Sequence, residues 1–378
     1  MKIHVYSIVS SLHDENALAL AESDFLSRIA DAAGFEFEFH GSNFDDYDAK
    51  RKNIVFIRTG GTEGKFKSLN LKGSVTLLSS GFDNSLAASM EILAYLRNRG
   101  QDGVILHGTP KKIAHDILKE DSSKETSYEF IRPLTRVDLE HVRAAVIGHP
   151  SDWLIASSLD YEKARELLGL EIIDIPMSEL LVRLKSFKGD MASFDGSLAI
   201  YSALKDIVRE FSLSGLTIRC FDLLDMVHNT GCLALAKLNA EGISAGCEGD
   251  VPTLVSMMIA KQKTGSPSFQ CNLSQVENDE LLFAHCTVPL NMVQQYCYDT
   301  HFESGIGTAI CGKFALEEVM IYKVSPSLEA EVAIPAIITD TPSKPNLCRT
   351  QIVVRAPKAS KYFLNNPFAN HHIVTKPF

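Results

Sequence analysis

Two acidic residues, Glu248 and Asp250, flank a single glycine just before an apolar segment, and this loop is the place in the chain best suited to chemistry. Asp250 is expected to cap a helix that has Pro252 in its first turn and the apolar residues of 254–259 on one buried face. A carboxylate on such a loop can bind a metal ion or move a proton. The simpler alternative is that Asp250 only caps the helix and Glu248 lies in a solvated loop.

Further residues that can bind a metal follow downstream. They are Asn272, His285, His371 and His372, at separations too long to form a compact motif. Oxygen ligands combined with one or two imidazoles suit Mn²⁺ or Mg²⁺ better than zinc. His285 lies in an apolar segment and is as readily a buried core histidine, and the two C-terminal histidines are as readily a solvated tail. Spacing alone therefore identifies no metal site.

Several segments, taken in their order along the chain, resemble one known family. They are CFDLLDMVHNTGCLALAKLNAEGIS, SAGCEGDVP, FQCN, LLFAHCTVP, THFESGIG, LCRTQIVV and NPFANHHIV. Together they resemble the L-fucose isomerase and L-arabinose isomerase superfamily, with the closest match to its short fucose isomerase-like branch. The resemblance covers most of residues 139–378 and, more loosely, the residues before them. It implies metal-assisted aldose–ketose isomerisation of a pentose, deoxyhexose or modified hexose through an enediolate.

The resemblance also implies a set of site residues. It brings the acid of the E-G-D loop, Glu248, to one metal ion together with His371, or with His372 if the register differs by one. It places Asn272 at the position of the family's second acid, and His285 at a histidine found in the arabinose branch. The implied cofactor is Mn²⁺ or Mg²⁺, and the implied catalytic residues are Glu248 and Asn272.

Asn272 departs from the family pattern, because the family has Asp or Glu at this position. An amide oxygen can bind a metal weakly but cannot act as a base. Either Glu248 is the only carboxylate base, or the chain has lost isomerisation and is a catalytically impaired sugar-binding relative. A register difference that brings Glu277 or Asp279 to the site is a further alternative, although the sequence ENDE is typical of a hairpin turn.

Four residues are expected to contact the sugar: Trp153, His372, Arg349 and Asp250. Trp153 is the only tryptophan, and its ring is equally suited to a domain interface. Arg349 can anchor a carboxylate or sulfonate, or pair with an acid of the chain. His301 and Glu303 lie in a polar loop that is expected either beside the site or in solvent.

The N-terminal part of the chain, residues 1–138, alternates strand-like and helix-like segments, which predicts a doubly wound parallel sheet. The helix that begins at Ser85 is expected to have Asp83 or Asn84 as its cap. The loop 59–65, TGGTEGK, follows a predicted strand and could contact a ligand, although it lacks the P-loop spacing and a ligand-free turn is the simpler interpretation. An unrelated two-lobed α/β enzyme that uses this loop for a sugar phosphate is a second rival hypothesis.

A charged segment, residues 119–130, is the best candidate for a linker. A second doubly wound α/β domain is predicted at 139–266, and it carries the Glu248 loop. Short strands punctuated by proline then predict a smaller β-rich C-terminal domain at 267–378, either a barrel or a sandwich.

Composition limits the remaining possibilities. The net charge of −10 argues against a surface for nucleic acid or anionic membranes, and no apolar run is long enough to cross a membrane. The first residues resemble a strand rather than a signal peptide, and the eight cysteines form no C-x-x-C pair, so we expect reduced thiols and a cytoplasmic location. Because the family builds its active sites between subunits, the resemblance implies a homo-oligomer with a small-molecule sugar as substrate.

Overall fold

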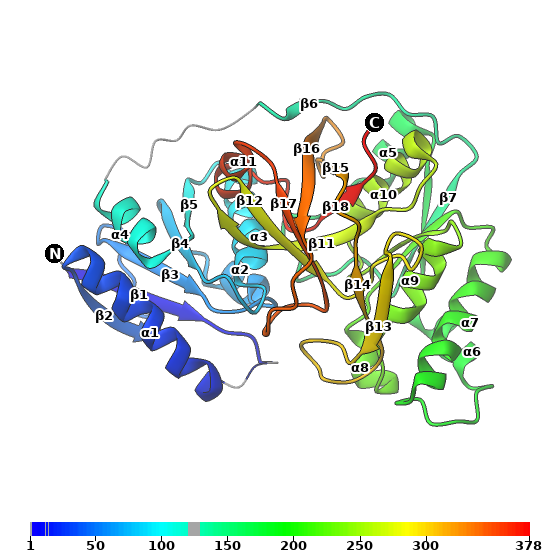
Figure 1. Ribbon diagram of the computed structural model, residues 1–378, viewed down its shortest axis with the longest axis horizontal. Helices are drawn as coiled ribbons and strands as arrows, with labels where there is room; N and C mark the ends of the chain where they lie inside the picture. Colours follow the sequence, from blue (N-terminus) through cyan, green and yellow to red (C-terminus); the bar gives the residue numbers. More distant parts are fainter. Residues whose placement is uncertain (1, 12, 14, 120–128) are drawn as a thin grey trace.

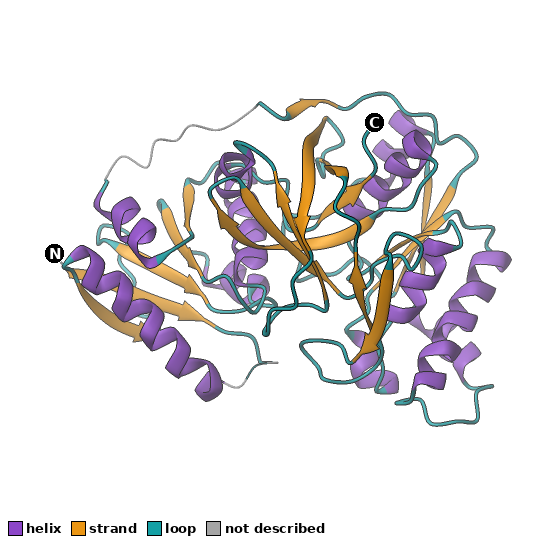
Figure 2. Cartoon of the chain, viewed as in Figure 1, coloured by secondary structure: helices purple, strands orange, loops and turns teal. Residues whose placement is uncertain are grey.

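The computed structural model describes residues 2–11, 13, 15–119 and 129–378. Two parallel sheets flank a central β-barrel (Figure 1). The N-terminal sheet lies on the left of this view and the second sheet on the right, and helices pack against both (Figure 2). The barrel is formed by the C-terminal third of the chain, so the last strands lie between the two α/β regions.

The first sheet has five parallel strands in the order β2-β1-β3-β4-β5. These are β1 Lys2–Ile8, β2 Glu36–Gly41, β3 Asn53–Ile57, β4 Val75–Ser79 and β5 Gly103–Leu106. Its helices are α1 Glu15–Ala33, α2 Glu63–Leu69, α3 Ser85–Asn98 and α4 Pro110–Leu118. One face packs on α1 and α4 through residues such as Ile29 and Ile113, and the other packs on α2 and α3 through Phe66 and Leu86. Because both faces are covered, the central strands are almost entirely apolar.

The second sheet has four parallel strands in the order β10-β9-β7-β8. These are β7 Arg143–Ile147, β8 Glu171–Ile175, β9 Gly215–Ile218 and β10 Ser244–Gly246. Its helices are α5 Tyr161–Leu168, α6 Met177–Leu184, α7 Phe194–Glu210, α8 Asp222–Val227, α9 Cys232–Ala240 and α10 Val251–Thr264. The buried helix α10 packs on this sheet with one side and on the barrel with the other.

Six antiparallel strands close into the barrel in the order β15-β18-β11-β12-β17-β16, with β15 and β16 paired to complete the circle. These are β11 Phe269–Glu277, β12 Glu280–His285, β15 Glu318–Val324, β16 Ala330–Asp340, β17 Thr350–Arg355 and β18 His372–Thr375. Strand β6, Ile131–Pro133, adds to the outside of β16. Helix α11, Ala359–Asn365, precedes β18, and a separate hairpin joins β13, Gln295–Asp299, to β14, Ala309–Lys313.

The predicted fold class is confirmed: two parallel-sheet α/β regions precede a C-terminal antiparallel barrel. The domain boundaries stay predictions; β6, which lies inside the range 1–138, pairs with the barrel. Most of the linker candidate, residues 120–128, lies outside the described residues. Among the helices of the described chain, none is both long enough and apolar enough to span a membrane. All eight cysteines are free thiols in this structure.

Candidate metal centre and its surroundings

The Glu248 loop makes a sharp turn between β10 and α10. Glu248 and Gly249 both have positive φ angles, of 61° and 60°. A Cβ atom at Gly249 would lie 3.0 Å from the His149 carbonyl oxygen and from the backbone nitrogen of Ser151, so only glycine fits without strain. The Ser151 hydroxyl donates a hydrogen bond to the Glu248 carbonyl oxygen. The turn is thus fixed against the segment that follows β7, and it holds the Glu248 side chain at the end of the sheet.

Three side chains that can bind a metal converge at this loop. Glu248, His285 and His371 each offer one ligand atom, and these atoms lie within 4.8 Å of one another. The Glu248 Oε1 atom is 3.3 Å from His371 Nε2 and 3.8 Å from His285 Nε2. The two imidazole rings meet edge to face, with centroids 5.6 Å apart. The group joins the second α/β region to two barrel segments, the end of β12 and the residue just before β18.

The far side of the His371 ring is held by Asp250. His371 Nδ1 is 2.9 Å from Asp250 Oδ2, so Nδ1 donates to this carboxylate and Nε2 is the ring atom that faces Glu248. His371 Nε2 is fully buried, and the group it faces is Glu248 Oε1, 3.3 Å away. A carboxylate–histidine pair such as Asp250–His371 is the usual support for a metal ligand. The donor set therefore fits a divalent cation.

Asp250 has two further partners that fix its position. Its side chain accepts a hydrogen bond of 2.8 Å from the Thr253 backbone N–H, which caps α10 as expected. The Lys323 ammonium group, fully buried on β15, lies 3.8 Å from Asp250 Oδ2. Burial would raise the pKa of Asp250, but Lys323 and His371 outweigh burial and hold the pKa at about 2. Asp250 is therefore ionised at all ordinary pH values.

The charges of the group are strongly interdependent. Burial disfavours the carboxylate of Glu248, but the two histidines reverse this effect and lower its pKa well below the usual range. Burial disfavours protonated His371, but the attraction of Glu248 and Asp250 raises its pKa to about 10. Burial lowers the pKa of His285, and Glu248 opposes this effect only in part. Without a metal, the proton on His371 takes the place that a cation would occupy.

Trp153 forms one wall beside Glu248. Its indole Nε1–H donates a long hydrogen bond of 3.4 Å to Glu248 Oε2. The guanidinium group of Arg219 stacks on the ring at 4.7 Å from its centroid, and Phe221 meets the ring edge to face at 5.5 Å. Phe221 also contacts the ring of His301, with centroids 6.0 Å apart. The hairpin loop 300–308 is thereby packed against this wall.

A line of polar side chains extends from the barrel to that hairpin loop. Asn272 on β11 donates a 3.4 Å hydrogen bond to Asn84 Oδ1, and Asn84 Nδ2 donates a 2.9 Å bond to Glu303 Oε1. A Cβ atom at Gly60 would lie 3.7 Å from the same Glu303 oxygen, so the glycine loop 59–65 lies against this carboxyl group. Burial raises the pKa of Glu303 to about 7, and the hydrogen bond from Asn84 only partly opposes the effect. Glu303 is thus a carboxyl group able to exchange a proton near neutral pH.

The expected site residues have different surroundings. His372 faces away from Glu248: its Nε2 atom is 2.8 Å from the Tyr362 hydroxyl and its Nδ1 atom 3.0 Å from the Asn370 carbonyl oxygen. Both ring nitrogens are occupied within the core. Arg349 donates hydrogen bonds to Thr300 and so anchors the hairpin loop at its first residue. Asn272 is buried, and its Oδ1 atom has no hydrogen-bond partner among the described residues.

Several residues that support the site were not expected from the sequence. Asn84 was expected only as a helix cap; instead its side chain makes no cap hydrogen bond and binds Glu303. Lys323 is a lone cation in an otherwise apolar strand, and that was the available signal. Glu91 is a lone acid in an apolar helix, and its carboxylate accepts hydrogen bonds from the backbone N–H groups of Ala156 and Asn370, at 2.6 and 2.9 Å. Glu91 therefore fixes the backbone beside His371.

Comparisons with known proteins find distant similarity to two curated relatives, and no family model matches the chain. A sulfoquinovose isomerase of Clostridium sp. (strain MSTE9) is 28% identical over 180 residues, which is 44% of this chain and 39% of the relative. A sulfoquinovose isomerase of Alkalicoccus urumqiensis is 22% identical over 227 residues, 54% of this chain and 49% of the relative. The matched segments thus span less than half of either relative. The chain is distantly similar to sulfoquinovose isomerases over about half its length, and this agrees with the coarser prediction of a sugar isomerase-like protein.

Proposed function

We propose that this protein is a metal-assisted aldose–ketose isomerase of the L-fucose and L-arabinose isomerase type. The observation that carries the proposal is the convergence of Glu248, His285 and His371 within 4.8 Å, with His371 Nε2 directed at the Glu248 carboxylate. The distant similarity to two sulfoquinovose isomerases gives independent support for the reaction class.

The proposed cofactor is Mn²⁺, with Mg²⁺ as the alternative, and Glu248, His285 and His371 would hold it. One carboxylate and two imidazoles suit a cation between hard and borderline, and the sequence resemblance adds the amide oxygen of Asn272 as a weak further ligand. A bound divalent ion would polarise the sugar oxygens on C1 and C2. Asp250 would fix the tautomer of His371, and Glu91 would fix the backbone of the preceding residue.

The proton transfer needs a carboxylate that can gain and lose a proton. Asn272 cannot act as a base, and Glu248 is the best metal ligand. We assign the proton transfer to Glu303, because its carboxyl group lies at the end of the hydrogen-bonded line from Asn272 through Asn84 and its pKa is raised to about 7. A general base with a pKa near the working pH combines adequate strength with the correct protonation state. In this proposal Glu303 replaces the second acid that the chain lacks at position 272.

The substrate would be an open-chain aldose packed against Trp153. Because both relatives are named sulfoquinovose isomerases, a sulfonated hexose is the first sugar to test. L-Fucose and L-arabinose follow from the resemblance in the sequence. Arg349 is held by the hairpin loop, with its guanidinium group partly exposed, and it remains the proposed anchor for an anionic group of the sugar.

The test is turnover of these three sugars by the manganese-loaded protein, followed by NMR in D₂O. Isomerisation introduces solvent deuterium at C2 of the aldose or C1 of the ketose, and we expect this for at least one sugar. Glu248→Gln keeps the shape of the side chain and should abolish the exchange, whereas Glu317→Gln, an exposed glutamate on the barrel, should not change it.

The rival hypothesis, an impaired sugar-binding relative, is favoured by one residue, Asn272. It predicts that the same sugars bind in calorimetry without any deuterium exchange. That result with fully manganese-loaded protein would contradict the isomerase proposal.

A further inference from the structure

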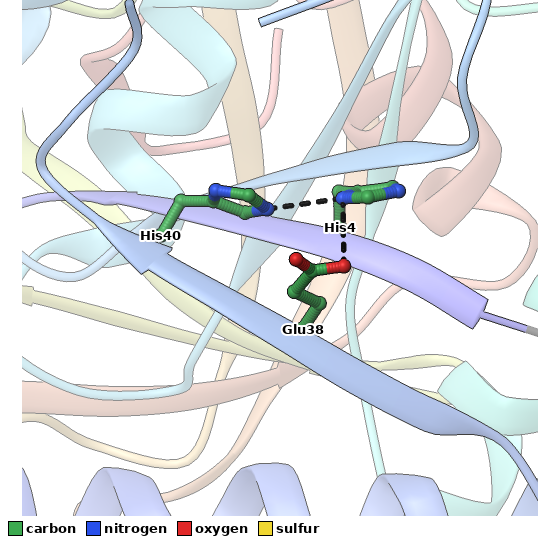
Figure 3. A group of neighbouring side chains, drawn as sticks. All are labelled: His4, Glu38 and His40. Atoms are coloured by element: carbon green, nitrogen blue, oxygen red, sulfur yellow. Dashed lines mark hydrogen bonds and ion pairs between the residues drawn. The ribbon is translucent and has the colours of Figure 1, made fainter. Parts of the chain in front are cut away.

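A second group of side chains with metal-binding chemistry lies far from the first, on the edge of the N-terminal sheet. His4 on β1 and Glu38 on the edge strand β2 are partners in the parallel register. A β-bulge follows, and it brings His40 over Tyr6, where the two rings stack at 4.5 Å. Figure 3 shows the three side chains converging from two adjacent strands, with dashed lines joining His4 to both Glu38 and His40.

The spacing of the donor atoms matches a small tetrahedral ion. His4 Nδ1 is 3.0 Å from His40 Nε2 and 3.4 Å from Glu38 Oε2. Zinc bonds to nitrogen and oxygen are about 2.0–2.2 Å long, so neighbouring ligand atoms of a tetrahedral site lie roughly 3.3–3.5 Å apart. The ligand atoms of the third pair, Glu38 and His40, lie within 4.8 Å of each other, and a rotation of the partly exposed Glu38 side chain would complete the site. Two imidazoles and one carboxylate leave the fourth position for water.

The surroundings of His40 already resemble those of a metal ligand. Asp46 Oδ2 lies 3.2 Å from His40 Nδ1, and the Tyr6 hydroxyl donates a 3.3 Å hydrogen bond to Asp46 Oδ1. The carboxylate favours the tautomer with its proton on Nδ1, which leaves the Nε2 lone pair directed at His4. A carboxylate behind a histidine is the usual outer partner of a metal-bound imidazole.

One side-chain cation, Lys2, would compete with zinc for the Glu38 carboxylate. The Lys2 ammonium group is 2.7 Å from the Glu38 oxygen that faces His4. Lys2 is 57% exposed and Glu38 is 38% exposed, so the lysine can swing into solvent while an ion enters from the same side. An exposed ion pair contributes little, and its loss would weaken zinc binding by no more than about fivefold.

We propose that His4, Glu38 and His40 form a zinc site that fastens the edge strand β2 to β1. The site is independent of the sugar isomerase proposal, since it shares no residue with the Glu248 group. Its ligand is a divalent cation that accepts four-coordinate geometry, because these three ligands and one water complete a zinc site, whereas at the Glu248 group Asn272 and the sugar would add the oxygen ligands that Mn²⁺ or Mg²⁺ requires. The bound ion would also cover part of a sheet edge that is otherwise open to pairing with another chain.

The test is a calorimetric zinc titration of the full chain in the Glu248→Gln background, which removes a ligand of the other metal centre. We expect one zinc ion per chain, lost on His4→Ala or His40→Ala and weakened at least tenfold on Glu38→Gln. His141→Ala, which removes an exposed histidine beside an acid, is the matched control and should not change binding. Circular dichroism would confirm that each variant is folded.

Lys2→Gln should change zinc affinity in the opposite direction from the ligand variants. Removing the competitor should tighten zinc binding by up to about fivefold, which a purely structural histidine pair would not do. Equal zinc stoichiometry and affinity in the parent and in folded His4→Ala and His40→Ala would overturn the proposal. So would zinc-edge anomalous diffraction without a peak between these three side chains.

Discussion

At the scale of single residues, the site contains two acids, Glu248 and Glu303, whose different environments give them different pKa values. Glu248 is kept ionised by two histidines, whereas Glu303 is kept close to its protonation midpoint by burial. Two acids with pKa values pushed apart in this way are the usual sign of distinct roles in one reaction. Glu248 is suited to hold a cation, and Glu303 is suited to carry a proton.

Replacing Glu303 tests the proton-transfer role. Glu303→Gln keeps an oxygen for the hydrogen bond from Asn84 but cannot accept a proton, so kcat should fall about 10²- to 10⁴-fold while manganese affinity stays within about twofold. In the wild type, activity should rise with pH through about 7 as Glu303 loses its proton, and this limb should be absent from the residual activity of the variant. Steady-state rates of both proteins between about pH 5 and 9 would show whether the rise near pH 7 is present in the wild type and absent in the variant. A variant with unchanged kcat would exclude Glu303 as the base.

Replacing Asp250 tests the support of His371. Asn is also a good helix cap, so Asp250→Asn should keep the start of α10 while removing the charge that orients the imidazole. Manganese affinity should fall about 10- to 100-fold, as for other outer partners of metal ligands. A manganese titration followed by electron paramagnetic resonance measures this, and thermal unfolding of the metal-free variant controls for the helix. Equal affinity in both proteins would mean that Asp250 serves only as a cap.

At the scale of elements, the strands and helices that position the site were largely predictable, because their apolar patterns are dictated by burial. Local sequence could not settle which of two adjacent histidines faces the metal group. His371 and His372 are both fully buried, but their side chains lie on opposite sides of the chain. His371 faces Glu248, and His372 faces Tyr362. A one-residue change of register exchanges the two faces of a strand, and the pairing of β18 with its two neighbours, β11 and β15, fixes that register.

The link from Asn272 to Glu303 was unpredictable for a related reason. Asn84 takes a left-handed conformation before α3, with φ of 58°, and this directs its side chain to the hairpin loop instead of its own helix. The partners Asn84 and Glu303 are 219 positions apart in sequence. Long-range contacts of this kind depend on how the barrel closes between the two sheets, which no local pattern encodes.

Helix α2 begins with an acid whose burial should make stability depend on pH. Glu63 is 3% exposed, and its Oε2 atom has no hydrogen-bond partner among the described residues. Burial raises its pKa to about 8, above the value of 4.5 expected in the unfolded chain. The folded state therefore holds the proton more tightly, and this stabilisation is present below pH 4.5 and lost as the pH rises through about 8.

Glu63→Gln should remove this penalty. At pH 8.5 or so the variant should be more stable than the wild type by about 1–3 kcal/mol, and the difference should shrink to near zero at about pH 5. Urea unfolding at the two pH values measures the change in free energy. If Glu63→Gln were instead destabilised equally at both pH values, the Glu63 carboxylate would have favourable partners in the folded protein, and the predicted penalty at high pH would be absent.

At the scale of the whole molecule, the barrel is the element that brings the parts together. It supplies His285 and Asn272 directly, places His371 at the entry to β18, and lies between the two parallel sheets (Figure 1). Glu248 comes from the second α/β region and Asn84 from the first, so the site depends on all three parts. Domain motions that separate them would open the site.

The homo-oligomer implied by the sequence resemblance stays a prediction. The family that the sequence resembles builds its sites between subunits, and the hairpin of β13 and β14 leaves Tyr296 and Tyr298 each 46% exposed. Multi-angle light scattering of the manganese-loaded protein should give a mass of at least twice the 41.6 kDa of one chain. A single-chain mass at micromolar concentration would contradict the expectation.

Glu248, His285 and His371 are proposed to form one metal centre. The most direct measurement is anomalous diffraction at the manganese absorption edge, from crystals soaked in Mn²⁺ with and without a sugar polyol. We predict one strong peak within bonding distance of Glu248 Oε1, His285 Nε2 and His371 Nε2, absent in Glu248→Gln. A map with no peak among these three atoms, in crystals whose wild-type protein remains ordered there, would contradict the account.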